Sequence, residues 1–194
     1  FLIKNFLDKL FALFFLVLSL PLIILFSLFI IIEDGFPIFF KQKRTGWDGN
    51  SFNIFKLRSL INSNKKNIST STQVASGDKR LLFIGKIIRR LSIDELPQFY
   101  NVLKGDMSIV GPRPHMTEHT KFYSYEVRNF MQRHKCLPGI TGWAQVHGLR
   151  GPTIEKGSMN SRFQHDLYYI KNWNLMLDFY ILVRTVFVVL FQKV

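Results

Sequence analysis

An uninterrupted apolar stretch near the start dominates the pattern of hydrophobic and polar positions along the chain. Residues 11–32, FALFFLVLSLPLIILFSLFIII, are 22 consecutive positions without a charged side chain. A helix of that length rises about 33 Å and can cross a hydrocarbon core of about 30 Å. The run is also longer than the apolar part of a signal peptide. We therefore expect residues 1–34 to form a membrane-inserted helix.

Two features indicate how this helix lies in the membrane. Pro21 is at its centre, two residues after Ser19, and a proline inside a helix removes one backbone hydrogen bond and kinks or breaks the helix. The basic residues that flank the stretch on its two sides are Lys4, Lys9, Lys41, Lys43 and Arg44. By the positive-inside rule, both ends then face the cytoplasm. The pattern favours a re-entrant helix that breaks at Ser19 and Pro21, and an ordinary kinked span is the alternative.

Short strand patterns follow the apolar stretch. Residues 36–40, FPIFF, are predicted to form a short strand or an interfacial anchor, and residues 51–60, SFNIFKLRSL, a second strand. The glycine turn RTGWDGN lies between them. Alternation along the second strand places Ile54, Lys56 and Arg58 on one face. The two cations then point the same way, either toward an anion or toward solvent. The polar residues 62–80 predict a loop.

Helical periodicity returns in the second half of the chain. Residues 84–91 place apolar side chains at the i, i+3, i+4 and i+7 positions, beside Arg89 and other basic residues. Such a helix either lies on anionic lipid or packs on a core. Residues 166–194 are rich in aromatic and apolar side chains, but Arg184 interrupts them and favours a helix at the membrane interface over a second span. These patterns predict an α+β fold that is mainly helical, with a small β element and amphipathic interfacial helices.

Composition narrows the choice of partner. The chain has 26 basic and 13 acidic residues, a formal charge of +13, and therefore an expected anionic partner: nucleic acid, a membrane surface or a phosphorylated substrate. With 47% hydrophobic residues and no recognisable nucleic-acid module, we expect no nucleic acid and favour lipid. Cys136 is the only cysteine, so no intrachain disulfide can form, as expected for a domain that faces the cytosol.

Two adjacent carboxylates, Asp94 and Glu95, open the stretch DELPQFYNVLKGD. If Asp94 caps the N-terminus of a helix, Pro97 falls in the first turn and Gly105 ends the helix. A capping box between Ser92 and Glu95 is a competing arrangement. Capping alone therefore explains both carboxylates.

The same geometry also suits phosphate chemistry. A carboxylate at a helix N-terminus near Arg89 is held ionised and can act as a nucleophile toward phosphorus. Such a reaction needs cations on the phosphate oxygens and often a divalent metal. The candidate cations are Lys56, Arg58 and Arg113, and the candidate metal ligands are the two carboxylates. The residue pattern by itself leaves capping and catalysis open.

Several longer sequence motifs, taken together, favour phosphate chemistry over helix capping. FPIFFKQKRTG, FKLRSL, IRRLSIDELPQFYNVLKGDMSIVGPRP, PGITGWAQVHGLRG and DLYYIKNW resemble the bacterial sugar transferase family, the monotopic polyprenyl-phosphate phosphoglycosyl transferases. The resemblance covers essentially the whole chain. It implies an enzyme of the bacterial inner membrane that faces the cytoplasm, transfers a sugar-1-phosphate from a UDP-sugar to polyprenyl phosphate with Mg²⁺, and releases UMP. A non-catalytic module that binds anionic lipid is the alternative class.

The resemblance also implies roles for single residues. Asp94 is the expected nucleophile, which forms a phosphosugar-Asp intermediate. Glu95 is expected to support the metal, or to support Asp94 as the second member of an Asp-Glu dyad. The expected phosphate-binding and basic-motif positions are Lys56, Arg58, Arg89 and Arg113, and the expected break of the membrane helix is at Ser19 and Pro21.

At the domain level, the resemblance implies that residues 35–194 form the catalytic domain. It leaves the sugar and the oligomeric state open, with a homodimer as one alternative. The HGLRG run is similar to larger members that begin polysaccharide chains, so the chain is expected to be their catalytic part.

Overall fold

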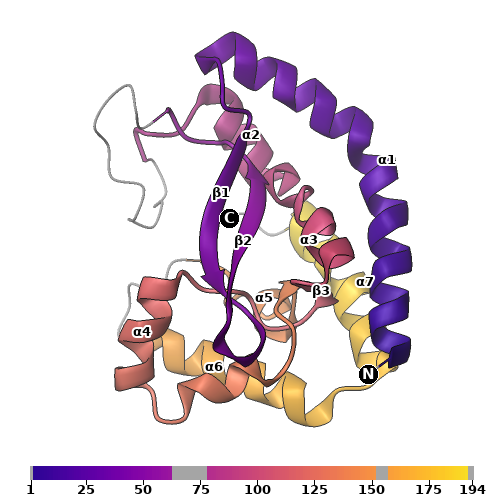
Figure 1. Ribbon diagram of the computed structural model, residues 1–194, viewed down its shortest axis with the longest axis vertical. Helices are drawn as coiled ribbons and strands as arrows, with labels where there is room; N and C mark the ends of the chain where they lie inside the picture. The colour runs from indigo at the N-terminus through magenta and orange to yellow at the C-terminus, as the bar shows by residue number, and fades with distance from the viewer. Residues whose placement is uncertain (1, 63–77, 152–156, 192–194) are drawn as a thin grey trace.

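The computed structural model describes residues 2–62, 78–151 and 157–191 (Figure 1). The predicted loop at 62–80 lies mostly outside these ranges. The described part is mainly helical with two small sheets, which confirms the predicted α+β class. Its helices are α1 (Leu2–Asp34), α2 (Phe83–Arg90), α3 (Gln98–Lys104), α4 (Thr117–Glu126), α5 (Trp143–Val146), α6 (Ser158–Asn172) and α7 (Leu175–Phe191). Its strands are β1 (Phe39–Thr45), β2 (Ser51–Leu57), β3 (Ser108–Val110) and β4 (Gly139–Thr141), and short 3₁₀ turns η1 (Trp47–Gly49), η3 (Ile93–Glu95) and η4 (Phe130–Lys135) complete it.

Helix α1 is continuous through Pro21, and its axis changes direction about midway (Figure 1). Among the described residues it is the one helix long and apolar enough to cross a membrane. The Ser19 hydroxyl donates to the Leu16 carbonyl oxygen, 3.0 Å away, in the turn that precedes the proline. The helix thus continues through Pro21.

One stripe of α1 packs along the domain. The buried residues of the helix are Asp8, Ala12, Ser19, Ile23, Ser27 and Ile30. They recur every three to seven positions and so share one face. Large apolar side chains cover the rest of the helix and are exposed, among them Phe14, Leu18 and Ile32. An exposed apolar surface of this extent is typical of contact with lipid.

Strands β1 and β2 form an antiparallel hairpin, as the turn predicts. The first strand was expected at 36–40 but begins at Phe39 and runs on to Thr45. Pro37 has no N–H for a ladder and its carbonyl oxygen accepts from Arg58, so the strand starts after it. The register pairs Phe40 with Lys56 and Arg44 with Phe52.

The main core lies around the parallel pair of β3 and β4, which α6 and α7 cover (Figure 1). Its buried members include Met107, Ile109, Val146 and Ile181. Beyond β3 the chain turns directly into the sequence Gly-Pro-Arg-Pro, so this core sets the position of Arg113.

The two predicted amphipathic segments are helices α2 and α7. In α2, Ile84 and Ile88 are buried while Phe83 and Ile87 are exposed, so the helix packs on the core and also leaves apolar side chains outside. Helix α7 exposes apolar side chains along most of its length, namely Leu175, Met176, Phe179, Tyr180, Val183, Val186, Phe187, Leu190 and Phe191.

Candidate functional site

The turn η3 places Asp94 and Glu95 ahead of α3, and neither residue caps that helix. Pro97 occupies the N-cap position of α3, so Asp94 is too far upstream to bond its first N–H groups. Ser92 has a left-handed backbone, with φ of 58°, and makes no capping hydrogen bond. The capping interpretation is therefore wrong. The predicted end of the helix is confirmed, since Gly105 has a φ of 89° there.

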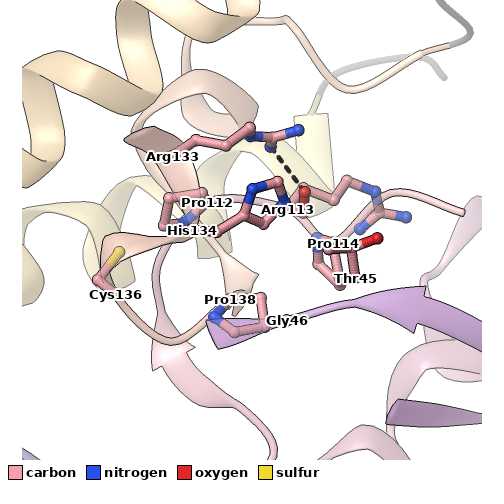
Figure 2. A pocket seen from close by; sticks show the side chains of 9 residues that line it. All are labelled: Thr45, Gly46, Pro112, Arg113, Pro114, Arg133, His134, Cys136 and Pro138. Carbon is pink, nitrogen blue, oxygen red and sulfur yellow. Dashed lines mark hydrogen bonds between the residues drawn. The ribbon is translucent and has the colours of Figure 1, made fainter. Parts of the chain in front are cut away.

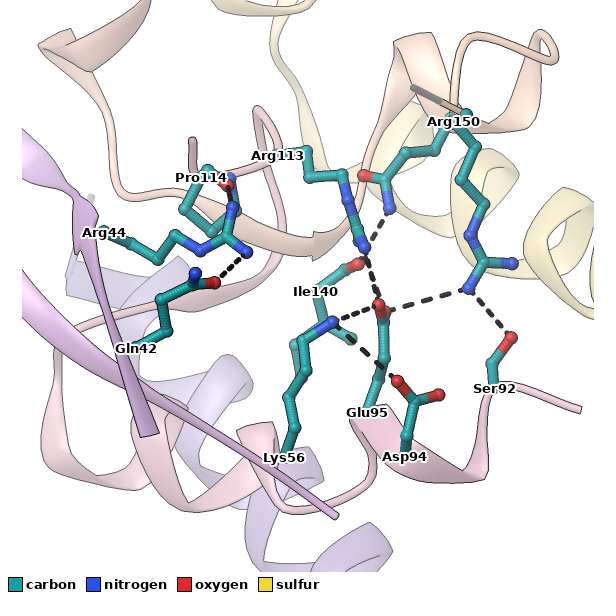
Figure 3. A network of polar contacts seen from close by, with 12 residues as sticks. Gln42, Arg44, Lys56, Ser92, Asp94, Glu95, Arg113, Pro114, Ile140 and Arg150 are labelled. Carbon is teal, nitrogen blue, oxygen red and sulfur yellow. Dashed lines mark hydrogen bonds and ion pairs between the residues drawn. The ribbon is translucent and has the colours of Figure 1, made fainter. Parts of the chain in front are cut away.

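Glu95 is the centre of a network of cations (Figure 3). Its Oε1 atom is 2.8 Å from Lys56 Nζ and 2.6 Å from Arg113 Nη2. Its Oε2 atom is 3.3 Å from Arg113 Nη1 and 3.8 Å from Arg150 Nη2. Burial alone would raise the pKa of Glu95, but Arg113, Lys56 and Arg150 together hold it well below its usual range. Glu95 is thus an ionised carboxylate whose two oxygens are already engaged.

Asp94 has the opposite surroundings, although it is the next residue. Its side chain is almost fully buried, and its Oδ2 atom lies 4.0 Å from Lys56 Nζ. No hydrogen bond to its carboxylate is present within the described ranges. Burial raises the pKa of Asp94, and the charge of Lys56 opposes that shift. The result is a poorly solvated carboxylate with free oxygens, which is what a nucleophile needs.

The structure brings only some of the predicted cations to this pair. Lys56 and Arg113 both contact Glu95. Arg58 points elsewhere and holds the end of α1, because it donates to the Asp34 carboxylate and to the carbonyl oxygens of residues 35, 37 and 60. Arg89, in the last turn of α2, forms no ion pair within the described ranges, and its charge lowers the pKa of Asp94.

Sequence patterns alone did not identify Arg150 as part of this site. It lies 55 positions after Glu95, yet its Nη2 atom is 2.8 Å from Ser92 Oγ and also approaches Glu95. The residue belongs to the HGLRG run, but no periodicity or spacing connects that run to Asp94.

Arg113 is held from behind by a buried ion pair. Arg133 Nη2 donates to the Arg113 carbonyl oxygen at 2.8 Å and pairs with Asp166 at 2.7 Å. Gly139 donates its N–H to the Pro112 carbonyl oxygen at 2.9 Å, so β4 supports the same loop. The backbone of the loop is thus bonded on either side of the guanidinium, which lowers the entropy cost of presenting it.

A small cavity lies behind this loop, lined by Thr45, Gly46, Pro112, Arg113, Pro114, Arg133, His134, Cys136 and Pro138 (Figure 2). It offers about 10 Å³ of space to solvent, room for about one water molecule. A nucleotide sugar cannot enter a cavity of this size.

The carboxylate of Asp94 is the one feature of the described site that suits a magnesium ion. No group of three or more His, Cys, Asp or Glu side chains occurs in the described part of the chain. Magnesium needs few protein ligands when substrate phosphates and waters complete its shell. Asp94 has oxygens available for that role, whereas those of Glu95 are bonded to cations.

Comparisons with known proteins identify relatives of this chain. A family model described as bacterial sugar transferase matches residues 1–192. A UDP-glucose:undecaprenyl-phosphate glucose-1-phosphate transferase of Xanthomonas campestris pv. campestris is 44% identical over 186 residues, which are 96% of this chain and 38% of that protein. The protein of the same name from Escherichia coli K12 is 41% identical over 187 residues, 96% of this chain and 40% of its own length.

A UDP-N-acetylgalactosamine-undecaprenyl-phosphate N-acetylgalactosaminephosphotransferase of Aeromonas hydrophila is 40% identical over 184 residues, 95% of this chain and 43% of that protein. The chain therefore spans about two fifths of the length of these three relatives.

Proposed function

Because this chain belongs to the bacterial sugar transferase family, we propose that it transfers a sugar-1-phosphate from a UDP-sugar to polyprenyl phosphate and releases UMP. The names of the similar proteins supply the two substrate classes. One observation carries the residue assignment: Glu95 is saturated by cations, while the buried carboxylate of Asp94 is not. The catalytic part, residues 35–194, would face the cytoplasm beside the membrane-inserted α1.

In the first step, an Asp94 carboxylate oxygen attacks the phosphorus that bears the sugar. A new O–P bond forms as the bond from that phosphorus to the bridging diphosphate oxygen breaks, and UMP departs with the electron pair. In the second step, a phosphate oxygen of the polyprenyl phosphate attacks the same phosphorus, and the Asp94 carboxylate leaves. The product is a polyprenyl-diphosphate-sugar, and Asp94 is restored.

Lys56 and Arg113 are placed to stabilise the phosphoryl oxygens as charge grows on them. Each has N–H donors beyond those bonded to Glu95, because an ammonium has three and a guanidinium five. Glu95 keeps both cations in place, and it is a positioning residue. When bound, magnesium supplies neutralising charge to the diphosphate, and Asp94 is the side chain with oxygens free to hold it.

The test is UMP release from a panel of UDP-sugars by the purified full chain in detergent, with polyprenyl phosphate and magnesium. We expect release with at least one donor, and a loss of about a thousandfold or more in Asp94→Asn, because the nucleophile is removed. Asp48→Asn, on the exposed hairpin turn, is the matched control and retains activity.

Intact mass measurement without the lipid acceptor gives a second readout. The wild type gains the mass of one sugar phosphate, and Asp94→Asn does not. Near-normal turnover by Asp94→Asn would refute the assignment. No release from any donor would favour a module that only binds anionic lipid.

A further inference from the structure

We propose that Arg44, positioned by Gln42, binds the phosphate of the nucleotide as it leaves. This inference rests on the function proposed above and adds a residue that the nucleophile and its cations do not include. The site then has two phosphate positions. The phosphate that bears the sugar lies between Asp94 and the cations Lys56 and Arg113, and the phosphate of the nucleotide lies beside Arg44.

The hairpin presents Arg44 on the face that carries Lys56. In the antiparallel register Arg44 pairs with Phe52 and Phe40 pairs with Lys56, so even positions of both strands share one face. On this face Arg44 Nη2 donates to Gln42 Oε1, and Arg44 Nη1 donates to the Pro114 carbonyl oxygen at 3.3 Å. Arg44 therefore lies directly beside the loop that presents Arg113.

The guanidinium of Arg44 has unused binding capacity. It forms no ion pair with a carboxylate in the described ranges, and its Nε atom is buried without a hydrogen-bond partner. Burial, and then the charge of Arg113, lower the pKa of Arg44 to about 10, so the group remains a cation at neutral pH. The charges of Glu95 and Glu118 oppose this shift but do not outweigh it. A largely buried cation without a contact ion pair is costly, and an anionic ligand reduces that cost.

The charge balance of the whole region points the same way. Its basic side chains are Arg44, Lys56, Arg113, Arg133, Arg150 and Arg162, and its carboxylates are Asp94, Glu95, Glu118 and Asp166. Positive charge thus exceeds negative charge in a poorly solvated region. A diphosphate, with about two negative charges, offsets most of this excess and gains charge-assisted hydrogen bonds.

The direction of attack decides which phosphate lies at Arg44. Attacking and leaving oxygens are roughly in line through the phosphorus, so the nucleotide leaves on the side away from Asp94. Figure 3 shows Asp94 on one side of Lys56 and Arg113, with Arg44 and Gln42 on the other. As the P–O bond breaks, the departing phosphate gains one negative charge, which Arg44 is placed to stabilise.

A purely structural role for Arg44, as a support for Pro114, makes a different prediction. Loss of such a support would disturb Arg113 and weaken every phosphate ligand alike. A role in binding the leaving phosphate is selective, because UMP has gone before polyprenyl phosphate reacts. The two possibilities therefore separate by substrate.

The experiment compares Arg44→Met and Arg44→Lys with Lys43→Met, the matched control on the exposed face of the same strand. We measure UMP binding by equilibrium dialysis, UMP inhibition, and KM for both substrates, all with the full chain in detergent. In Arg44→Met, UMP binding and inhibition should weaken about 10- to 100-fold, and KM for polyprenyl phosphate should stay within about twofold. Arg44→Lys should restore part of the affinity, and Lys43→Met should match the wild type.

The inference is overturned if Arg44→Met binds UMP as tightly as the wild type, or if both substrates lose affinity equally. Dialysis does not need turnover, so it separates the two proposals. A wild type that binds UMP through Arg44 but transfers no sugar phosphate would refute only the proposed reaction. A wild type that binds no UMP would refute the assignment of Arg44.

Discussion

At the scale of single residues, the site separates two neighbouring carboxylates into different roles. Glu95 accepts from Lys56 and Arg113, and its pKa is well below the usual range, because these cations outweigh the effect of burial. Asp94 is equally hidden from water but lacks such bonds, so burial raises its pKa. Adjacent positions with opposite shifts are a recurrent feature of acid-base and nucleophilic sites.

This arrangement predicts a dependence on pH. The reactive form of Asp94 is the carboxylate, so UMP release should fall as the pH drops through its raised pKa. Lys56 lowers that pKa, and its removal in Lys56→Met should therefore move the acid limb of the pH profile to higher pH. The measurement is the initial rate of UMP release across pH, with Lys43→Met as control.

Lys56→Met should also lower the rate at every pH, because a cation on the phosphate is lost. The midpoint of the acid limb is therefore the informative quantity. A shift to lower pH, or no shift, would contradict the electrostatic coupling between Lys56 and Asp94.

At the scale of elements, helices far apart in the sequence share one polar cluster at the start of α1. Lys4 Nζ is 2.6 Å from Asp178 Oδ2 in α7, and the Asp8 carboxylate accepts from Ser108 Oγ in β3 at 2.6 Å. The Tyr169 hydroxyl of α6 lies 2.7 Å from Asp178 Oδ1 and 3.0 Å from the Val110 carbonyl oxygen. The cluster thus connects α1, α6 and α7 to the strand that leads to Arg113.

Removal of one hydroxyl tests this connection. Tyr169→Phe leaves the buried Asp178 oxygen and the Val110 carbonyl without that donor, so we expect a loss of about 1–3 kcal/mol of unfolding free energy. Tyr168→Phe is the matched control, since Tyr168 is 47% exposed and its ring stacks on Trp143 through carbon atoms that phenylalanine retains. Denaturant titration in detergent measures both, and equal stabilities would argue against the cluster.

At the scale of the whole molecule, both ends of α1 contact the same domain. Near the first end Lys4 pairs with Asp178. At the last end Asp34 accepts from Arg58, and Glu33 accepts from the backbone N–H of Ile84 at 3.0 Å. A helix tied to one body at both ends cannot easily place them on opposite sides of a bilayer, and this supports the re-entrant prediction.

Cysteine labelling tests that topology. Leu2→Cys and Phe36→Cys, one at each end of α1, should both react with a membrane-impermeant thiol reagent from the cytoplasmic face only. Cys136 gives little background, because burial raises the pKa of its thiol to about 12, and Cys136→Ala removes it. Labelling from opposite faces would establish a span and would require the contacts at one end of α1 to be broken.

Sequence by itself determined the features that depend on a few neighbouring residues. The uninterrupted apolar stretch predicted α1, helical periodicity predicted the basic helix at 84–91, and alternation predicted the second strand. Gly105 predicted the end of α3, where its backbone is left-handed. The quoted motifs identified Asp94 and Glu95 as candidate site residues. These features follow from local backbone preferences and from the burial of one face of each element.

Only the tertiary structure decided what surrounds each carboxylate. Lys56 and Arg58 are two positions apart on one strand, yet one contacts Glu95 and the other holds the end of α1. The partners of Glu95 come from 39 residues before it and 18 residues after it, and Arg150 comes from farther still. A long flexible side chain pairs with whichever opposite charge the packed backbone brings within reach. The distance between two charges that are far apart along the chain cannot be predicted from a short stretch of sequence.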